Sequence, residues 1–198
     1  MIDINKVIEE LKQANSNGFV NETHFQVEFG YALKRVYPEY DLTFEWANEY
    51  HMRIDLIAKS ENETVGFEFK YYTKDAIIEL NHGLKVQLKN QAAANLHRIG
   101  FWKDVSKIEK LNMIRQLDYG FCLFLTNDEK IFNPINSSNY DKDFDISDGI
   151  KPEKQNLHYE SKPQYDSDIM NKYSLKHRPY NDKGFYLLDL LVNIFTKR

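Results

Sequence analysis

The sequence predicts a single α/β domain in which a mixed central sheet, flanked by helices, begins with an antiparallel meander. Residues 20–126 read in the order helix, three strands, helix and strand. The last of these strands, "YGFCLFLT" (119–126), is a continuous apolar run bounded by turn-forming residues, which is typical of a buried strand. The length of 198 residues suits one domain with a decorating subregion.

Helical periodicity is clear in the N-terminal part of the chain. The apolar positions of residues 2–14 recur at helical spacing, and "NSNG" (15–18) ends this predicted helix. A second helix is predicted over residues 21–37, because Asn21 is a favourable N-cap and Pro38 cannot continue a helix.

Strands and further helices are predicted between Pro38 and the buried strand. The helix after the meander is predicted from composition alone, since "KVQLKNQAAANLHRI" is rich in helix-forming residues. The spans are strands 41–49, 52–59 and 64–72, a helix over 85–99, a second helix over 103–117 and the strand 119–126.

The C-terminal third of the sequence is less regular. Residues 133–172 are rich in Asn, Asp, Ser, Lys, Tyr and Pro, and we interpret them as an insertion of surface loops around short elements. A strand is predicted over 171–179, a turn between strands over 177–184, and a strand or a helix over 183–195. Residues 173–198 are therefore expected to return the chain to the core.

Composition excludes several classes of protein. One cysteine, Cys122, excludes an internal disulfide framework and a cysteine-based zinc site, and its apolar surroundings predict a core residue. With a net charge of −4, any nucleic-acid-binding surface must be a local basic patch. We expect a cytoplasmic protein without a membrane span, because the N-terminus lacks a signal-peptide pattern and the longest apolar stretch is short and interrupted.

A hairpin at residues 52–72 carries four charges. Because side chains alternate along a strand, Arg53 and Asp55 share one face of the first strand, and Glu68 and Lys70 share one face of the second. A symmetric turn would place Asp55 opposite Glu68, with Cβ atoms about 5 Å apart, and Arg53 opposite Lys70. Two carboxylates at that distance repel each other unless a cation lies between them, and Mg²⁺ prefers oxygen ligands of this kind.

An ion-pair ladder is the alternative explanation for these charges. In that arrangement Asp55 pairs diagonally with Lys70 and Arg53 with Glu68, and each pair contributes only about 0.2–1 kcal/mol. The apolar and aromatic neighbours of the charges favour a cleft instead, because they indicate a strand whose far face is covered.

The motif "RID" followed by "EFK", with twelve residues between Asp55 and Glu68, resembles the signature of the PD-(D/E)xK nuclease superfamily. Ile54 stands where this family often has proline. The order of elements in residues 20–126 is similar as well. The resemblance therefore implies a restriction-endonuclease-like core (αβββαβ) with a C-terminal loop-rich elaboration.

The resemblance also implies a role for each residue of the motif. Asp55, Glu68 and the backbone carbonyl of Phe69 would bind Mg²⁺ or Mn²⁺. Lys70 would position the attacking water or stabilise the charge that develops on the phosphate, and the sequence does not decide between these roles.

A glutamate from the helix before the meander often completes such a site in the family. Glu28 matches the usual placement better than Glu22, and Glu45 in the first strand is a weaker candidate. A solvent-facing glutamate without a catalytic role is the alternative for both helix positions.

Contacts to nucleic acid are predicted for residues that follow the motif. Three of them lie near one another on the predicted helix 85–99, and phosphate contacts supply most non-specific affinity. The predicted set is Lys74, Lys85, Lys89, Gln91 and Arg98. A solvated helix face is again the alternative.

These observations lead to the hypothesis of a Mg²⁺-dependent nuclease that hydrolyses phosphodiester bonds of DNA, an endonuclease of restriction or defence type. RNA is a further candidate substrate, and a homodimer is a candidate assembly. Two alternatives stay open: a catalytically inactive nuclease-like scaffold that binds nucleic acid or protein, and an unrelated α/β domain whose charges form only an ion-pair ladder.

Overall fold

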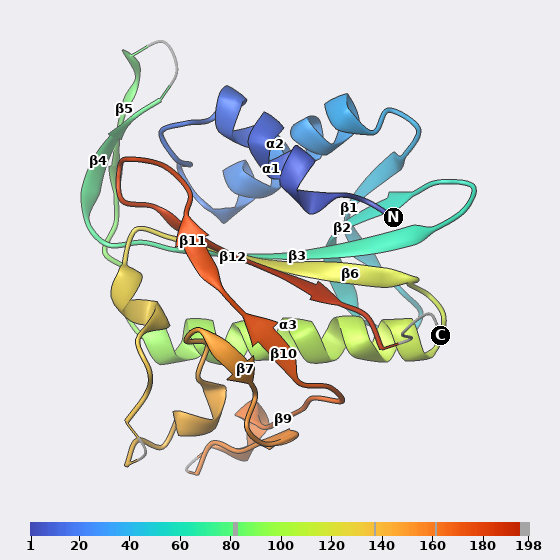
Figure 1. The fold of residues 1–198 in the computed structure, drawn as a ribbon, viewed down its shortest axis with the longest axis vertical. Coiled ribbons are helices and arrows are strands. Elements are labelled where there is room, and N and C mark those ends of the chain that lie inside the picture. Colours follow the sequence, from blue (N-terminus) through green and yellow to red (C-terminus); the bar gives the residue numbers. More distant parts are fainter. Residues whose placement is uncertain (81–82, 137, 161, 195–198) are drawn as a thin grey trace.

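The chain folds around a six-stranded mixed sheet with strand order β1-β2-β3-β6-β12-β11. The computed structural model describes residues 1–80, 83–136, 138–160 and 162–194. Figure 1 shows α1 and α2 on one face of the sheet and α3 along the other. The helices are α1 (Ile4–Ala14), α2 (Glu22–Val36) and α3 (Ala94–Met113), and the strands of this sheet are β1 (Asp41–Ala47), β2 (Arg53–Lys59), β3 (Thr64–Tyr72), β6 (Tyr119–Thr126), β11 (His177–Pro179) and β12 (Tyr186–Val192).

Strands β1, β2 and β3 form the predicted antiparallel meander. Strand β2 pairs with β3 from Lys59 opposite Thr64 to Leu56 opposite Phe67, and these four pairs have the predicted register. The ladder ends before the predicted pairs Asp55–Glu68 and Arg53–Lys70. Strand β3 then runs parallel to β6, whereas the other neighbours in the sheet are antiparallel. A parallel pair needs a crossover connection, and α3 lies within it.

The sheet separates two hydrophobic cores. On the face covered by α1 and α2, Phe29 packs against Phe69 of β3 with ring centroids 5.1 Å apart. The opposite face is covered by α3, and Cys122 of β6 is buried there, as expected. Because side chains alternate along β3, Glu68 and Lys70 point away from Phe69 and toward α3.

The predicted helix over residues 85–99 is wrong in its first half. Lys85–Leu88 form strand β5, which pairs antiparallel with β4 (Ala76–Glu79) in a hairpin beyond the end of β3 (Figure 1). The cross-strand pairing overrides the helix-forming composition of this segment. Helix α3 then runs without a break from Ala94 to Met113, so the predicted helix over 103–117 is the C-terminal part of the same helix.

Where the structure describes it, the segment 133–172 consists of loops and short elements, and it lies against α3 on the side away from the sheet (Figure 1). Glu109 of α3 binds the end of this segment, because its buried carboxylate accepts hydrogen bonds from Met170 N (2.8 Å), Asn171 N (3.0 Å) and Tyr173 Oη (2.6 Å). The short elements are 3-10 helices at Lys142–Phe144 and Pro163–Tyr165 and strands β7 (Gly149–Lys151), β8 (Asn156–Leu157) and β9 (Ser167–Asp168); a further 3-10 helix, Glu129–Phe132, precedes the segment.

The last part of the chain returns to the main sheet. The span 171–179, predicted as one strand, contains two short strands in different sheets: β10 (Tyr173–Leu175) pairs with β7, and β11 pairs with β12. The span 183–195, predicted as a strand or a helix, contains strand β12, which pairs with β6 along its whole length. Its last residue, Phe195, lies outside the described residues.

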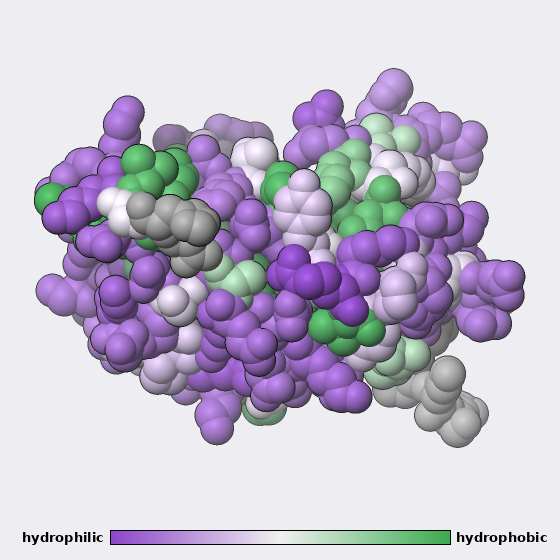
Figure 2. All heavy atoms as spheres, turned by 90° about the horizontal axis from the view of Figure 1, so that it is seen from above, coloured by the Kyte–Doolittle hydropathy of each residue, from purple (hydrophilic) through white to green (hydrophobic). Residues whose placement is uncertain are grey.

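The surface seen from the side of α1 and α2 is largely hydrophilic, and hydrophobic side chains appear there in separate groups (Figure 2). Within the described ranges, no helix is both long enough and apolar enough to cross a membrane.

Candidate functional site

Along one edge at the end of β3, side-chain oxygens take the place of a neighbouring strand as hydrogen-bond acceptors for the backbone N–H groups. Strand β2 leaves β3 after the pair Leu56–Phe67, so the following N–H groups on this edge need other acceptors. Three side chains from distant parts of the chain supply them. The hydrogen bonds run from Phe69 N to Asp55 Oδ2 (2.9 Å), from Tyr71 N to Glu22 Oε2 (2.8 Å) and from Thr73 N to Gln91 Oε1 (3.2 Å).

Two acidic and two basic side chains meet between β3 and α3. Lys70 Nζ lies 2.5 Å from Asp104 Oδ2, and Lys107 Nζ lies 2.5 Å from Glu68 Oε1 and 3.3 Å from Asp104 Oδ1. Lys70 also donates to the carbonyl oxygen of Phe69 (3.1 Å). Asp104 therefore bridges the two lysines and joins α3 to the motif on β3.

Close packing of α3 on β3 holds these groups in place. Gly100 allows this approach, because a Cβ atom at that position would lie 3.0 Å from Lys70 Cε. Only 2% of Glu68 is exposed to solvent. The cluster is therefore a partly enclosed site between helix and sheet, and not an open surface.

Burial and neighbouring charges shift the pKa values in this cluster. Burial raises the pKa of Glu22, Asp55 and Glu68 above their ordinary values, although the nearby lysines oppose the shift. Burial alone would lower the pKa of Lys70, but Asp104 and Glu22 raise it above its ordinary value. The lysine is therefore fully protonated at neutral pH, whereas ionising the carboxylates costs free energy.

The cluster has too little positive charge for its carboxylates. Glu22 and Asp55 interact electrostatically with charged groups between β3 and α3 and are counted as part of the cluster. Its six charged members are the carboxylates of Glu22, Asp55, Glu68 and Asp104 and the ammonium groups of Lys70 and Lys107. When all are ionised, negative charges exceed positive charges by two. One divalent cation would remove this excess and favour the ionised carboxylates.

The oxygen atoms of the motif suit a hard divalent cation. Asp55 and Glu68 offer carboxylate oxygens and Phe69 offers a carbonyl oxygen, the donors that Mg²⁺ prefers. Two of these donors already contact an ammonium group: Glu68 forms an ion pair with Lys107, and the Phe69 carbonyl oxygen accepts a hydrogen bond from Lys70. In the part of the chain that the structure describes, no three acidic, histidine or cysteine side chains converge on one point. A cation bound by Glu68 Oε1 would have to replace Lys107.

The ion pairs of Lys70 and Arg53 differ from those of the ion-pair ladder that is the alternative explanation. Lys70 pairs with Asp104 of α3, and Arg53 pairs with Glu45 of β1 (3.1 Å). The motif lysine is thus held by a helix that covers it, which is the arrangement of a buried site.

Glu28 and Glu45 lie outside the cluster. Glu28 accepts a hydrogen bond from Asn15 Nδ2 (2.8 Å), and Glu45 is engaged by Arg53. Glu22 lies in the first turn of α2 and accepts a hydrogen bond from Tyr71 N near the end of β3, so it is the helix glutamate that reaches the site. The structure thus brings Glu22 to the motif, whereas Glu28, which the sequence favoured, lies apart from it.

The lysines predicted to contact nucleic acid lie on or beside the β4–β5 hairpin. Lys85 and Lys89 are exposed, and Lys74 Nζ lies 2.8 Å from Asp128 Oδ1. The helical spacing that linked Lys85 and Lys89 with Gln91 does not apply, since all three precede α3.

Gln91 and Arg98 have structural contacts. Gln91 is joined to Thr73 through its backbone N–H (2.8 Å) as well as through its side chain. Arg98 Nε donates to the carbonyl oxygen of Ile131 (2.9 Å), and its Nη1 lies 3.9 Å from Asp141 Oδ2. These contacts hold the segment before α3 and the segment after β6, and a contact of either side chain to nucleic acid stays a prediction.

Asp104 and Lys107 are the site residues that sequence reasoning missed. They are three residues apart in α3 and therefore share one face of the helix. A helix that connects two parallel strands packs on their sheet, so this face can meet the motif. The segment "KDVSK" (103–107) contains this signal, which becomes usable once the helix is recognised as the crossover.

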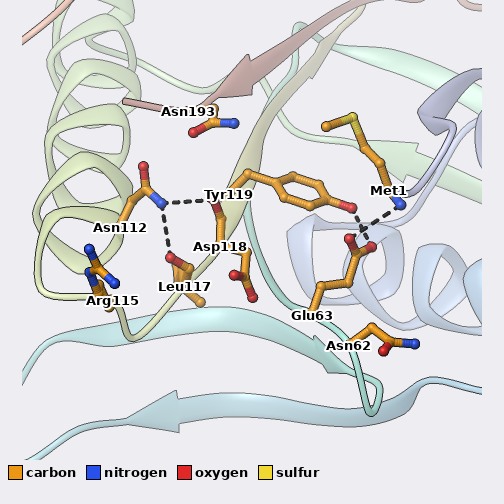
Figure 3. A pocket seen from close by; sticks show the side chains of 9 residues that line it. All are labelled: Met1, Asn62, Glu63, Asn112, Arg115, Leu117, Asp118, Tyr119 and Asn193. Carbon is orange, nitrogen blue, oxygen red and sulfur yellow. Dashed lines mark hydrogen bonds and ion pairs between the residues drawn. The ribbon is translucent and has the colours of Figure 1, made fainter. Parts of the chain in front are cut away.

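Away from the cluster, a hollow of about 460 Å³ lies where β3 and β6 begin (Figure 3). Glu63 accepts hydrogen bonds there from Tyr119 Oη (2.6 Å) and Tyr40 Oη (2.5 Å), and Asn112 Nδ2 donates to the carbonyl oxygens of Leu117 (2.9 Å) and Asp118 (2.8 Å). These hydrogen bonds hold the ends of the surrounding segments together.

Comparison with known proteins adds no relative. No family model matches the sequence, and neither a curated protein nor a solved structure matches the chain. The resemblance to the PD-(D/E)xK nucleases therefore stays a prediction from the motif and the order of elements in the sequence.

Proposed function

We propose that this protein is a metal-dependent nuclease that hydrolyses phosphodiester bonds of DNA, and that Asp55, Glu68 and Lys70 of the cluster carry the reaction. The observation that carries the proposal is the partly enclosed cluster between β3 and α3, where the buried Glu68 and Lys70 meet Asp104 and Lys107. Asp55 lies beside them, with its carboxylate hydrogen-bonded to Phe69 N. RNA as substrate, a role in restriction or defence, and a homodimer remain predictions of the same proposal.

Each residue of the cluster has a role in this proposal. Asp55, Glu68 and the carbonyl of Phe69 would hold Mg²⁺ or Mn²⁺, which when bound polarises a phosphate and lowers the pKa of a water molecule. Lys70 keeps its proton and lies within reach of the Phe69 carbonyl, so it can stabilise negative charge that develops on the phosphate. Asp104 is a positioning residue, because it holds the Lys70 ammonium group.

A cleavage assay tests the proposal. Plasmid, linear duplex and single-stranded DNA are incubated with the protein in Mg²⁺, in Mn²⁺ and in EDTA, and the products are separated by electrophoresis. We expect cleavage with the metals and none in EDTA. Cleavage that persists in Lys70→Ala would indicate a contaminating enzyme. Absence of cleavage of every DNA and RNA substrate with either metal would contradict the proposal.

A catalytically inactive scaffold is the second candidate, and one observation favours it. Asp55 and Glu22 already accept backbone hydrogen bonds, and Lys107 already neutralises Glu68, so the cluster can be stable without a metal. A scaffold would bind nucleic acid or protein equally well before and after Asp55→Asn, whereas the nuclease loses its metal-dependent activity.

A further inference from the structure

A second hollow, of about 410 Å³, lies beside the cluster, between α3 and the segment 164–168. It is lined by one side of α3, by the residue before β2 and by the short elements that pack on α3. The lining residues are Met52, Lys103, Ser106, Lys107, Lys110, Gln164, Asp166, Ser167 and Asp168.

Three lysines line the α3 side of this hollow. Lys103, Lys107 and Lys110 are spaced by four and three residues, so they follow one face of the helix. Lys103 Nζ donates to the carbonyl oxygen of Gln164 (2.9 Å), and Lys110 is exposed. The wall on the α3 side is therefore positively charged.

The acidic residues of the opposite wall are engaged by other groups. Asp166 Oδ1 accepts from Tyr159 N (2.9 Å) and its Oδ2 lies 2.9 Å from His158 Nδ1. Asp168 Oδ1 accepts from Asn156 Nδ2 (2.6 Å). These hydrogen bonds orient the two carboxylates but do not remove their charge. With three ammonium groups against two carboxylates, the lining still has one net positive charge toward an anionic ligand.

Lys107 belongs to both sites. Lys107 lines the hollow, and its ammonium group contacts Glu68 and Asp104 in the cluster. A flexible four-carbon stem lets a lysine ammonium group change partners without movement of the backbone. The side chain can therefore serve the carboxylate in one state and an anion in the hollow in another.

We propose that Lys107 is the counter-ion of Glu68 in the absence of a divalent cation, and that cation binding releases it into the hollow, where Lys103, Lys107 and Lys110 bind a backbone phosphate of the substrate strand. This inference rests on the proposed function, because it names how the same site recognises its substrate. It assigns the hollow to a phosphodiester of the nucleic acid and assigns to Lys107 the coupling between metal and substrate.

The coupling works in both directions. A cation that takes the place of Lys107 at Glu68 makes the third lysine available to the phosphate, and a phosphate that binds Lys107 removes the competitor of the cation. Linkage requires that each ligand strengthens the binding of the other by the same factor. Each ligand alone binds more weakly than the pair.

Calorimetric titration of Mn²⁺ tests this inference, with and without a phosphorothioate oligothymidylate that resists hydrolysis. In the wild-type protein the oligonucleotide should tighten Mn²⁺ binding. Lys107→Met should bind Mn²⁺ alone about 10-fold more tightly, because the competing ammonium group is gone, and the oligonucleotide should no longer change that affinity.

Lys103→Met and Lys110→Met are companion variants on the same helix face, and they control for the Mn²⁺ affinity because the ion pair with Glu68 belongs to Lys107. They should weaken binding of the oligonucleotide, with Mn²⁺ affinity measured alone unchanged. They also keep the inference testable if Lys107→Met does not fold, because loss of phosphate binding in both variants is required by the proposal.

Two results would overturn the inference. Mn²⁺ affinity of Lys107→Met that equals or falls below that of the wild type would exclude competition at Glu68, and unchanged oligonucleotide binding in Lys103→Met and Lys110→Met would exclude the hollow as the phosphate site. Either result together with metal-dependent cleavage by the wild type leaves the proposed function standing. A wild-type protein that neither binds Mn²⁺ nor cleaves DNA contradicts the proposed function itself.

Discussion

Replacing Asp55 by asparagine is expected to reduce metal-dependent cleavage by about 10³-fold while the protein stays folded. Loss of one group that stabilises the charge of a transition state typically costs ~10²–10³-fold in rate, and Asp55 is proposed to bind the metal as well. The asparagine carbonyl can still accept the hydrogen bond from Phe69 N that Asp55 Oδ2 accepts now. The variant therefore separates the charge of this residue from its part in completing the edge of β3.

Initial rates of plasmid cleavage with Mg²⁺ measure this effect, and urea unfolding measures stability. Because burial disfavours the charged form of Asp55, we expect the free energy of unfolding to change by less than about 1 kcal/mol. Glu45→Gln is the matched control, since Glu45 pairs with Arg53 outside the cluster, and it should cleave at the wild-type rate. Wild-type cleavage by a folded Asp55→Asn variant would remove Asp55 from the mechanism.

Replacing Asp104 by asparagine is expected to lower the free energy of unfolding by about 3 kcal/mol. Removal of one partner from a buried ion pair leaves the other charge without compensation, and such changes cost about 3–5 kcal/mol. Asp104 contacts both Lys70 and Lys107, and its side chain is 10% exposed. Cleavage should also fall, because the Lys70 ammonium group loses the carboxylate that positions it.

Urea unfolding of Asp104→Asn against Asp182→Asn measures this cost. Asp182 lies exposed in the turn between β11 and β12, so its replacement should leave stability within about 0.5 kcal/mol of the wild type. Equal stability of the two variants would show that the bridge between α3 and β3 contributes nothing to the fold.

Much of the sheet can be predicted from the sequence, because alternation and turn signals are local. The predicted register of the 52–72 hairpin is observed from Lys59–Thr64 to Leu56–Phe67, but the ladder does not extend to the predicted pairs Asp55–Glu68 and Arg53–Lys70. The buried strand 119–126 has its predicted bounds. These features follow from the pattern of neighbouring residues. The architecture agrees with the predicted mixed sheet, and assignment of the nuclease fold remains part of the proposal.

The parts that could not be predicted depend on contacts between distant segments. Strand β5 has a helix-forming composition, and only its pairing with β4 makes it a strand. Glu22 reaches the site because the first turn of α2 meets the end of β3, which no local pattern reveals. The same holds for Asp104 and Lys107, since their role depends on how α3 crosses the sheet.

Crystals soaked in Mn²⁺ and measured for anomalous scattering give the most direct test of a divalent-cation site at this cluster. We predict a Mn²⁺ peak about 2.0–2.6 Å from carboxylate oxygens of Asp55 and Glu68 and from the carbonyl oxygen of Phe69. Lys107 Nζ should then have left Glu68. Crystals that bind Mn²⁺ only elsewhere, with the contact between Lys107 and Glu68 intact, would contradict the account.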